Sequence, residues 1–253
     1  MKQIPNLFTL LNLIAGCLAI VFILQTGEGI INYNGQDWKI YLPEKIWWGS
    51  VCIGIAGIID FLDGFVARLF KSTSEMGKQL DSLADVVSFG VAPGMIMYQL
   101  LRISFASTED GLDVAMFSLI PAFLVPAAAA WRLARFNISE PNLSGFTGIP
   151  APAAGLLIAS FPLILLYNYF NVQQLLLNRW VLYLLIFVIS YLMVSRLPMI
   201  SMKFSGGGAK GNLPKIILVV VAVLAAITLK WLAVPVVFLA YILISLIYKK
   251  QTA

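Results

Sequence analysis

The sequence contains no histidine and few charged residues of either sign. Lys, Arg, Asp and Glu make up 11% of its 253 residues, whereas soluble globular proteins contain about 25%. A site without histidine must take its general base from a carboxylate or from a less usual group such as Lys, Tyr or Cys. Only two cysteines are present, Cys17 and Cys52. Both lie in apolar runs without metal-ligand spacing, so we expect buried hydrophobic residues rather than a thiol site.

Apolar residues dominate what remains. They make up 60% of the chain, and the mean hydropathy is +0.90, which places most of the chain in lipid. A membrane-spanning helix needs about 20 apolar residues, and a helix satisfies its own backbone groups there. Apolar runs occupy residues 7–24, 46–70, 83–103, 114–136, 153–170, 180–199, 216–229 and 231–247.

These runs predict an all-α fold: a polytopic membrane helix bundle of about eight transmembrane helices, forming a single integral membrane domain over residues 1–253. We expect a catalytic six-helix core at residues 1–200 and two additional C-terminal helices at 213–248. Because only Lys230 separates the last two runs, one long kinked region is the alternative to two short helices.

Two local signals interrupt this pattern. Pro93 and Gly94 should bend or break the third run. The polar segment 25–45, which contains an Asn34-Gly35 pair, reads as a loop.

The positive charges predict the orientation. With the N-terminus inside, twelve of the 17 Lys and Arg residues fall in cytoplasmic segments, which satisfies the positive-inside rule. The net charge of +5 therefore calls for no nucleic acid. We expect an integral protein of the cell (cytoplasmic) membrane, with residues 60–85, the end of the run at 114–136 and the proline-rich loop 145–152 all facing the cytoplasm.

Four aspartates stand out against the apolar background: Asp60, Asp63, Asp81 and Asp85 fall within 26 residues. On helices, the first two share one face and the last two share another. A short connection between antiparallel helices turns these faces toward each other. Each aspartate at membrane depth costs about 2.5–3.5 kcal/mol, so the group needs a cation, and a hard divalent ion with oxygen ligands is the natural one.

Small residues flank the aspartates. Gly64, Ala67 and Gly77 leave space beside the carboxylates, and Arg68 lies close by in the sequence. A divalent cation, open space and a nearby guanidinium together indicate a substrate that carries phosphate.

The spacing D-x2-D-G-x2-A-R-x8-G-x3-D-x3-D resembles, without a gap, the signature of the CDP-alcohol phosphatidyltransferase family. The resemblance implies transfer of a phosphatidyl-type group from a CDP-linked lipid to an alcohol, with release of CMP. It implies two Mg²⁺ or Mn²⁺ ions, and Asp85 as the general base. The implied residues are Asp60, Asp63, Asp81 and Asp85 for the metals, and Gly64, Ala67, Arg68, Gly77 and Lys78 for the nucleotide or lipid phosphate.

Three further stretches resemble the phosphatidylserine synthase branch of this family: residues 4–12, 132–137 and 146–152. This similarity implies CDP-diacylglycerol and L-serine as substrates in phospholipid biosynthesis, and the family suggests a homodimer. Arg132 and Arg135 could hold the serine carboxylate or the lipid phosphate, or could be ordinary positive charge at a cytoplasmic helix end.

Several alternatives stay open at this level. The acceptor could be glycerol phosphate, inositol phosphate or an amino alcohol, although a phosphorylated acceptor calls for additional Arg or Lys. A cation transporter could also use intramembrane aspartates, but its polar groups would span several depths rather than one. Asn6 and Asn12 could face the site or could bond between helices.

Overall fold

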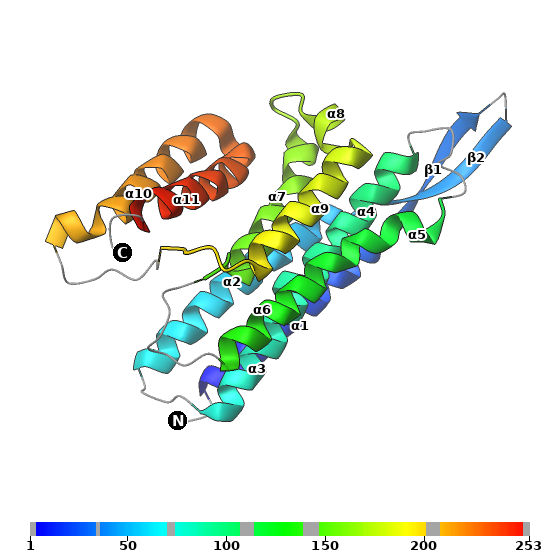
Figure 1. The fold of residues 1–253 in the computed structure, drawn as a ribbon. Coiled ribbons are helices and arrows are strands. Elements are labelled where there is room, and N and C mark those ends of the chain that lie inside the picture. The colour runs from blue at the N-terminus through cyan, green and yellow to red at the C-terminus, as the bar shows by residue number, and fades with distance from the viewer. Residues whose placement is uncertain are drawn as a thin grey trace.

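The computed structural model describes residues 4–33, 36–69, 74–106, 114–138, 147–200 and 208–249. Long helices run side by side and form an elongated bundle (Figure 1). The elements are α1 (Ile4–Leu24), β1 (Thr26–Tyr33), β2 (Gln36–Pro43), α2 (Ile46–Leu69), α3 (Glu75–Asp85), the π-helical η1 (Val86–Val91), α4 (Ala92–Ala106), α5 (Met116–Leu119), the 3₁₀-helical η3 (Ile120–Phe123), α6 (Leu124–Ile138), α7 (Ala151–Tyr167), α8 (Gln173–Leu176), α9 (Arg179–Val194), α10 (Gly208–Leu229), the 3₁₀-helical η4 (Lys230–Leu232) and α11 (Ala233–Lys249).

The chain is an integral membrane protein, mostly helical. Five helical stretches among the described residues are long and apolar enough to cross a membrane: Asn6–Leu24, Ile46–Val66, Glu75–Ala106, Met116–Ile138 and Asn212–Tyr248. Helices α7 and α9 are apolar but shorter. The expected number of eight transmembrane helices is therefore not confirmed, because only five described stretches are long enough.

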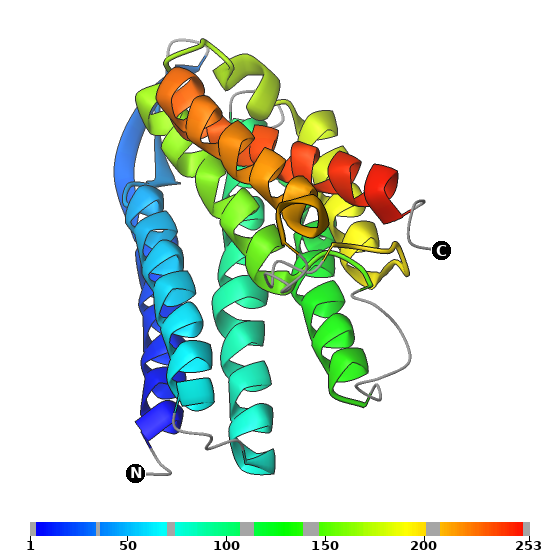
Figure 2. The ribbon, with the colours of Figure 1, turned by 90° about the vertical axis from the view of Figure 1, so that its left-hand side faces the viewer.

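The C-terminal stretch contains two helices. At η4 the chain reverses, with Lys230 at a positive φ of 51°, and α10 and α11 pack against each other as an antiparallel pair (Figure 2). This pair crosses the outside of α7. Two short helices, rather than one long kinked helix, therefore follow the core.

The segment between α1 and α2 is a β-hairpin, so the prediction of a loop was wrong. Strands β1 and β2 pair antiparallel from Thr26 opposite Pro43 to Tyr33 opposite Gln36. The joining pair Asn34-Gly35 lies outside the described residues, but Asn-Gly between β-branched and aromatic residues is a strong hairpin signal. The fold is thus not wholly α, and the hairpin lies at the end of the bundle away from the N-terminus (Figure 1).

The third run is irregular in the turn that precedes its proline, which is where a proline disturbs a helix. Residues Glu75–Ala106 form one continuous helix of 32 residues, and its π-helical segment η1 ends before Pro93. Pro93 lacks an N–H, and a proline ring crowds the carbonyl four residues earlier, which here belongs to Phe89 of η1, so the expected local irregularity is present. Gly94 is needed for packing, since a Cβ there would lie 2.7 Å from the Pro126 ring of α6.

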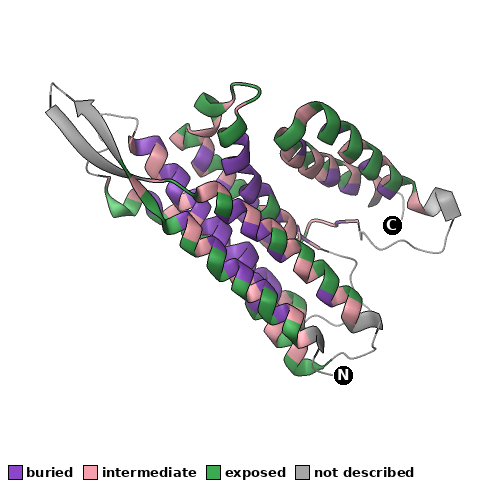
Figure 3. Cartoon of the chain, turned by 180° about the vertical axis from the view of Figure 1, so that it is seen from behind, coloured by how far each residue is buried: buried purple, intermediate pink, exposed green. Residues whose placement is uncertain are grey.

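Buried side chains concentrate where α1, α2, α4, α6, α7 and α9 meet (Figure 3). Phe89 of η1 is fully buried and packs on Gly155 of α7, where a Cβ would lie 3.0 Å from the Phe89 backbone. Cys52 is buried as expected, whereas Cys17 is exposed, which corrects that prediction for the first cysteine. Close contact at η1 holds the helix that carries Asp81 and Asp85 against its neighbours.

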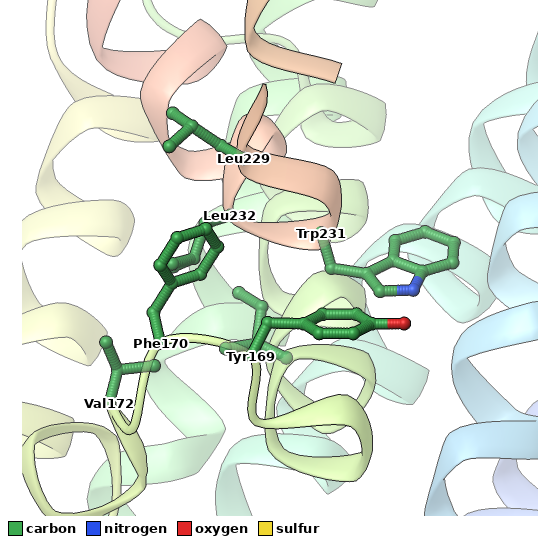
Figure 4. A pocket seen from close by; sticks show the side chains of 7 residues that line it. Tyr169, Phe170, Val172, Leu229, Trp231 and Leu232 are labelled. Atoms are coloured by element: carbon green, nitrogen blue, oxygen red, sulfur yellow. The ribbon is translucent and has the colours of Figure 1, made fainter. Parts of the chain in front are cut away.

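The turn of the C-terminal pair rests on an aromatic cluster beyond α7 (Figure 4). The Lys230 ammonium lies 3.5 Å from the centre of the Tyr169 ring, and Tyr167 stacks on both Tyr169 and Trp231. The hollow beneath holds only about 10 Å³, which is at the lower limit for one water molecule. The cluster therefore fastens the pair and is too small for a substrate.

Candidate active site

Three carboxylates from two helices meet near the N-terminal end of the bundle. Asp60 and Asp63 come from α2, and Asp81 comes from α3. One oxygen of each lies within 4.8 Å of the others. Helix α2 supplies its pair one turn apart on one face, and the short connection to α3 brings Asp81 opposite them. The grouping expected from the spacing is thus present.

Asp85 lies beside this group but is not one of its three members. It is 6% exposed and lies close enough to Asp60 and Asp81 to interact electrostatically with both. Its Oδ1 accepts a hydrogen bond of 3.3 Å from Asn12 Nδ2. Asp85 therefore lies outside the three-carboxylate cluster and accepts a hydrogen bond from Asn12.

Helix α1 supplies hydrogen-bond donors to both acidic helices. Thr9 Oγ1 donates to Asp63 Oδ2 at 3.1 Å, and Asn12 donates to Asp85. The Ser88 hydroxyl donates to the Asn12 carbonyl oxygen at 3.0 Å. Gly16 permits this approach, because a Cβ there would collide with Ser88. Asn12 thus forms a hydrogen bond between helices and also lies beside the acidic group, so both readings of this residue remain in place.

The end of α6 is tied to α3. Lys78 Nζ donates to the Asn137 carbonyl oxygen at 2.8 Å, and Asn137 Nδ2 donates to Ser82 Oγ at 2.7 Å. Lys78 is exposed, so its ammonium lies at the rim of the site. The α6 end thus converges on the acidic helices, as the orientation argument expects.

The two candidate arginines have different surroundings. Arg132 is 6% exposed and interacts electrostatically with Asp85 and with Tyr241 of α11. Arg135 donates from Nη1 to the Val194 carbonyl at 2.8 Å and from Nη2 to the Ser195 carbonyl at 3.2 Å. These carbonyls end α9, so Arg135 caps a helix, whereas Arg132 interacts with the Asp85 carboxylate.

The small residues also differ in their surroundings. A Cβ at Gly64 would meet no atom of the described residues within 4 Å, which leaves space beside Asp63. At Gly77 a Cβ would lie 3.0 Å from Asn6 Oδ1, so the absence of a side chain there allows α1 and α3 to approach closely. Ala67 and Arg68 belong to the last turns of α2, but their side chains lie outside the described residues.

The donor set fits a hard divalent cation. Asp81 Oδ1 is buried and accepts no hydrogen bond from any described residue. A buried carboxylate oxygen without a donor or counter-ion is unfavourable, and three converging carboxylates repel one another. Mg²⁺ and Mn²⁺ bind carboxylate oxygens, so one cation would resolve both problems.

Three site residues were missed or left undecided by the sequence analysis. Thr9 and Tyr241 carried no assignment, and Asn12 had two. A signal for α1 existed, since Asn6, Thr9 and Asn12 recur every three residues along one helix. No sequence pattern assigns Tyr241 to the site, because it lies 109 positions from Arg132 and the packing of α11 brings the two together.

Comparison with known proteins gives a consistent picture. A sequence model of the CDP-alcohol phosphatidyltransferase family matches residues 2–192. The CDP-diacylglycerol–serine O-phosphatidyltransferase of Bacillus subtilis is 31% identical over 163 residues, which cover 64% of this chain and 77% of that protein. The enzyme of the same name from Methanocaldococcus jannaschii is 43% identical over 104 residues, or 41% of this chain and 45% of that protein.

A third relative has a different name. The archaetidylserine synthase of Methanothermobacter thermautotrophicus is 29% identical over 167 residues, covering 65% of this chain and 60% of that protein. The family match includes α1 to most of α9, and with them every carboxylate of the cluster, while α10 and α11 follow it. Because one family model spans residues 2–192 and most of the Bacillus relative is matched, the chain belongs to the CDP-alcohol phosphatidyltransferase family.

Proposed function

We propose that the protein transfers the phosphatidyl group of CDP-diacylglycerol to the hydroxyl of L-serine, forming phosphatidylserine and CMP in phospholipid biosynthesis. The observation that carries this proposal is the three-carboxylate cluster with Asp85 beside it, in a chain of this family. Serine as the acceptor is supported by the names of the relatives, all of which specify a serine product or substrate.

Asp60, Asp63 and Asp81 would hold the divalent cations, with Mg²⁺ or Mn²⁺ as the ions and two ions as the expected number. Bound there, the cations supply charge neutralisation at the pyrophosphate and at the leaving group. Thr9 keeps Asp63 turned toward the cluster by its hydrogen bond. The open space at Gly64 suits the approach of a nucleotide, with Arg68 and Lys78 as candidate phosphate contacts.

Asp85 is our candidate for the general base. The serine hydroxyl gives its proton to the Asp85 carboxylate, and its oxygen forms a bond to the phosphorus that carries the diacylglycerol. The bond between that phosphorus and the bridging oxygen breaks, and the electron pair leaves with CMP. A carboxylate suits this task in a chain with no histidine. Arg132, buried and near Asp85, is placed to hold a substrate anion.

The arrangement in the membrane is part of the proposal. The site would face the cytoplasm from a cytoplasmic membrane, within one domain whose core precedes α10 and whose last two helices are an addition. The expected homodimer comes from the family resemblance, and the mass of the purified protein in detergent tests it.

Another acceptor is the second candidate. Glycerol phosphate or inositol phosphate would bring a further phosphate and would call for more cations than Arg132, Arg68 and Lys78. The cation-transporter alternative is disfavoured because the four aspartates lie at one level of the bundle.

The deciding experiment is the incorporation of radiolabelled serine into lipid by the purified protein, with CDP-diacylglycerol and Mn²⁺ or Mg²⁺. We expect phosphatidylserine and CMP in equal amounts, no product with EDTA, and much less product with the Asp60→Asn variant. Transfer to glycerol phosphate, inositol phosphate or ethanolamine but not to serine would contradict the acceptor. No transfer to any of them, with cation uptake into liposomes, would contradict the enzyme.

A further inference from the structure

Asn12 presents, next to the proposed base, an acceptor that no described residue pairs with. Its side chain is fully buried on α1, and its Nδ2 donates to Asp85 Oδ1 at 3.3 Å. An ionised carboxylate accepts hydrogen bonds and cannot donate them. The orientation of the Asn12 amide is therefore fixed by its partner, with the nitrogen toward Asp85 and the oxygen turned elsewhere.

That oxygen has no partner within the part of the chain that the structure describes. Asn12 Oδ1 is buried and accepts no hydrogen bond from any described residue. An unpaired buried amide oxygen is unfavourable. Because amide nitrogen and oxygen share one carbon, Asn12 Oδ1 cannot lie farther than about 6 Å from Asp85 Oδ1. A donor on the substrate would satisfy it.

The chemistry of the acceptor identifies that donor. In the proposed reaction the serine hydroxyl gives its only hydrogen to Asp85, so it has none left for Asn12. The remaining donors of serine are the three N–H groups of its ammonium. Hydroxyl oxygen and ammonium nitrogen are borne by adjacent carbons and lie about 3 Å apart when gauche. Two acceptors separated by less than about 6 Å can therefore each take one of them.

We propose that Asn12 Oδ1 accepts a hydrogen bond from the ammonium group of L-serine, so that Asn12 selects an acceptor with an amino group next to its hydroxyl carbon. The inference rests on the proposed function. The bond is charge-assisted, because the donor is a cation. The same amide thus orients Asp85 through Nδ2 and binds the serine ammonium group through Oδ1.

The test compares L-serine with 3-hydroxypropionate, which lacks only the ammonium group. The Michaelis constant for serine and the inhibition constant of 3-hydroxypropionate are measured for the wild type and for Asn12→Ala, Asn12→Asp and Thr9→Val. Binding of CDP-diacylglycerol with Mn²⁺ checks that each variant is folded. Thr9→Val is the matched control, since Thr9 lies on the same helix and bonds to Asp63 instead.

In Asn12→Ala the Michaelis constant for serine should rise about tenfold or more, while the inhibition constant of 3-hydroxypropionate changes less than twofold. Asn12→Asp keeps an acceptor oxygen but loses the donor to Asp85, so kcat should fall while the Michaelis constant stays near that of the wild type. In Thr9→Val the ratio of the two constants should not change.

An unchanged Michaelis constant in Asn12→Ala would overturn the inference and leave Asn12 as a residue that only orients Asp85. A parallel rise of both constants would also overturn it, because the ammonium would not be the group recognised. If the wild type transfers no serine at all, the proposed function fails instead, and the wild-type measurement shows this before any variant is compared.

Discussion

At the scale of single residues, the acidic group divides into a cluster of three and a fourth member with its own donor. Asp60, Asp63 and Asp81 share the space that a cation would occupy, and Asp85 is bonded to Asn12. Sequence spacing predicted that the four would meet, because helical periodicity fixes which residues share a face. It could not predict the hydrogen bonds from α1 to Asp63 and Asp85, because α1 lies more than 50 positions away in the chain.

Substitution of the fourth carboxylate tests its role as the base. Asp85→Asn keeps the shape and removes the proton acceptor, so transfer should fall by about 10²–10⁴-fold while CDP-diacylglycerol still binds. The test measures single-turnover serine transfer and the affinity for CDP-diacylglycerol, both at saturating Mn²⁺. Lost affinity would instead make Asp85 a metal ligand, and intact transfer would remove it from the mechanism.

The cluster members should respond to metal concentration. Asp60→Asn, Asp63→Asn and Asp81→Asn each remove one charged ligand, so each should lose most activity and need more Mn²⁺ for what remains. Titration of transfer rate against Mn²⁺ measures this, with Ser190→Ala, a buried polar residue of α9, as the control. A variant with normal turnover at low metal would place that residue outside the metal site.

The two arginines allow a matched comparison. Arg132→Lys loses bidentate geometry beside Asp85, so the Michaelis constant for serine or for CDP-diacylglycerol should rise and identify the anion bound. Arg135→Lys weakens a helix cap, so it should lower the free energy of unfolding by about 1–3 kcal/mol with a smaller kinetic effect. The opposite pattern would reverse the two assignments. Sequence alone treated the pair as equivalent, since both stand at one helix end.

At the scale of elements, the loop before α7 is fixed to the end of α9. The Gly148 N–H donates to the Leu197 carbonyl at 2.8 Å, and the Ile149 N–H donates to the Leu192 carbonyl at 3.1 Å. Gly148 has a φ of +71°, and a Cβ there would lie 2.8 Å from two carbonyl oxygens of α9 and its end. The prolines of this loop favour a rigid entry into α7, but its partner could not be predicted, because the pairing joins distant segments.

Gly148→Ala should therefore destabilise the protein by about 1–3 kcal/mol, as expected for a side chain forced into a left-handed conformation. Thermal or denaturant unfolding in detergent measures the change. Gly54→Ala is the control, because a Cβ there meets nothing within 4 Å and alanine favours a helix. Equal stability of the two variants would mean that the loop can move away from α9 without cost.

The β-hairpin and the irregular turn of the third helix differ in how far local sequence signals predict them. The β-hairpin was missed because a polar, glycine-rich segment was assigned by composition, although its alternating aromatic and β-branched residues on both sides of Asn34-Gly35 favour strands. The irregular turn of the third helix is η1, directly before Pro93, because a proline disturbs the turn on its N-terminal side. Helix lengths were predicted well where apolar runs were long.

At the scale of the whole molecule, different segments of the chain gather at the two ends of the bundle. The N-terminus, the end of α2, the start of α3 and the end of α6 lie at one end, while the β-hairpin and α8 lie at the other (Figures 1 and 2). The positive-inside rule independently assigns the first set of segments to the cytoplasm. Charge distribution and fold therefore agree on which segments share a side, and both put the carboxylates toward the first end.

Labelling of single cysteines tests which end faces the cytoplasm. In a background without Cys17 and Cys52, we expect Ser74→Cys at the start of α3 to react with an impermeant thiol reagent only after the cells are opened. Gln174→Cys in α8, at the other end, should react in intact cells. Both positions are exposed, so a difference in labelling reports the side rather than burial, and the cysteine-free parent gives the background. Labelling of Ser74→Cys in intact cells would invert the orientation and move the carboxylates, with their substrate serine, to the outer side of the membrane.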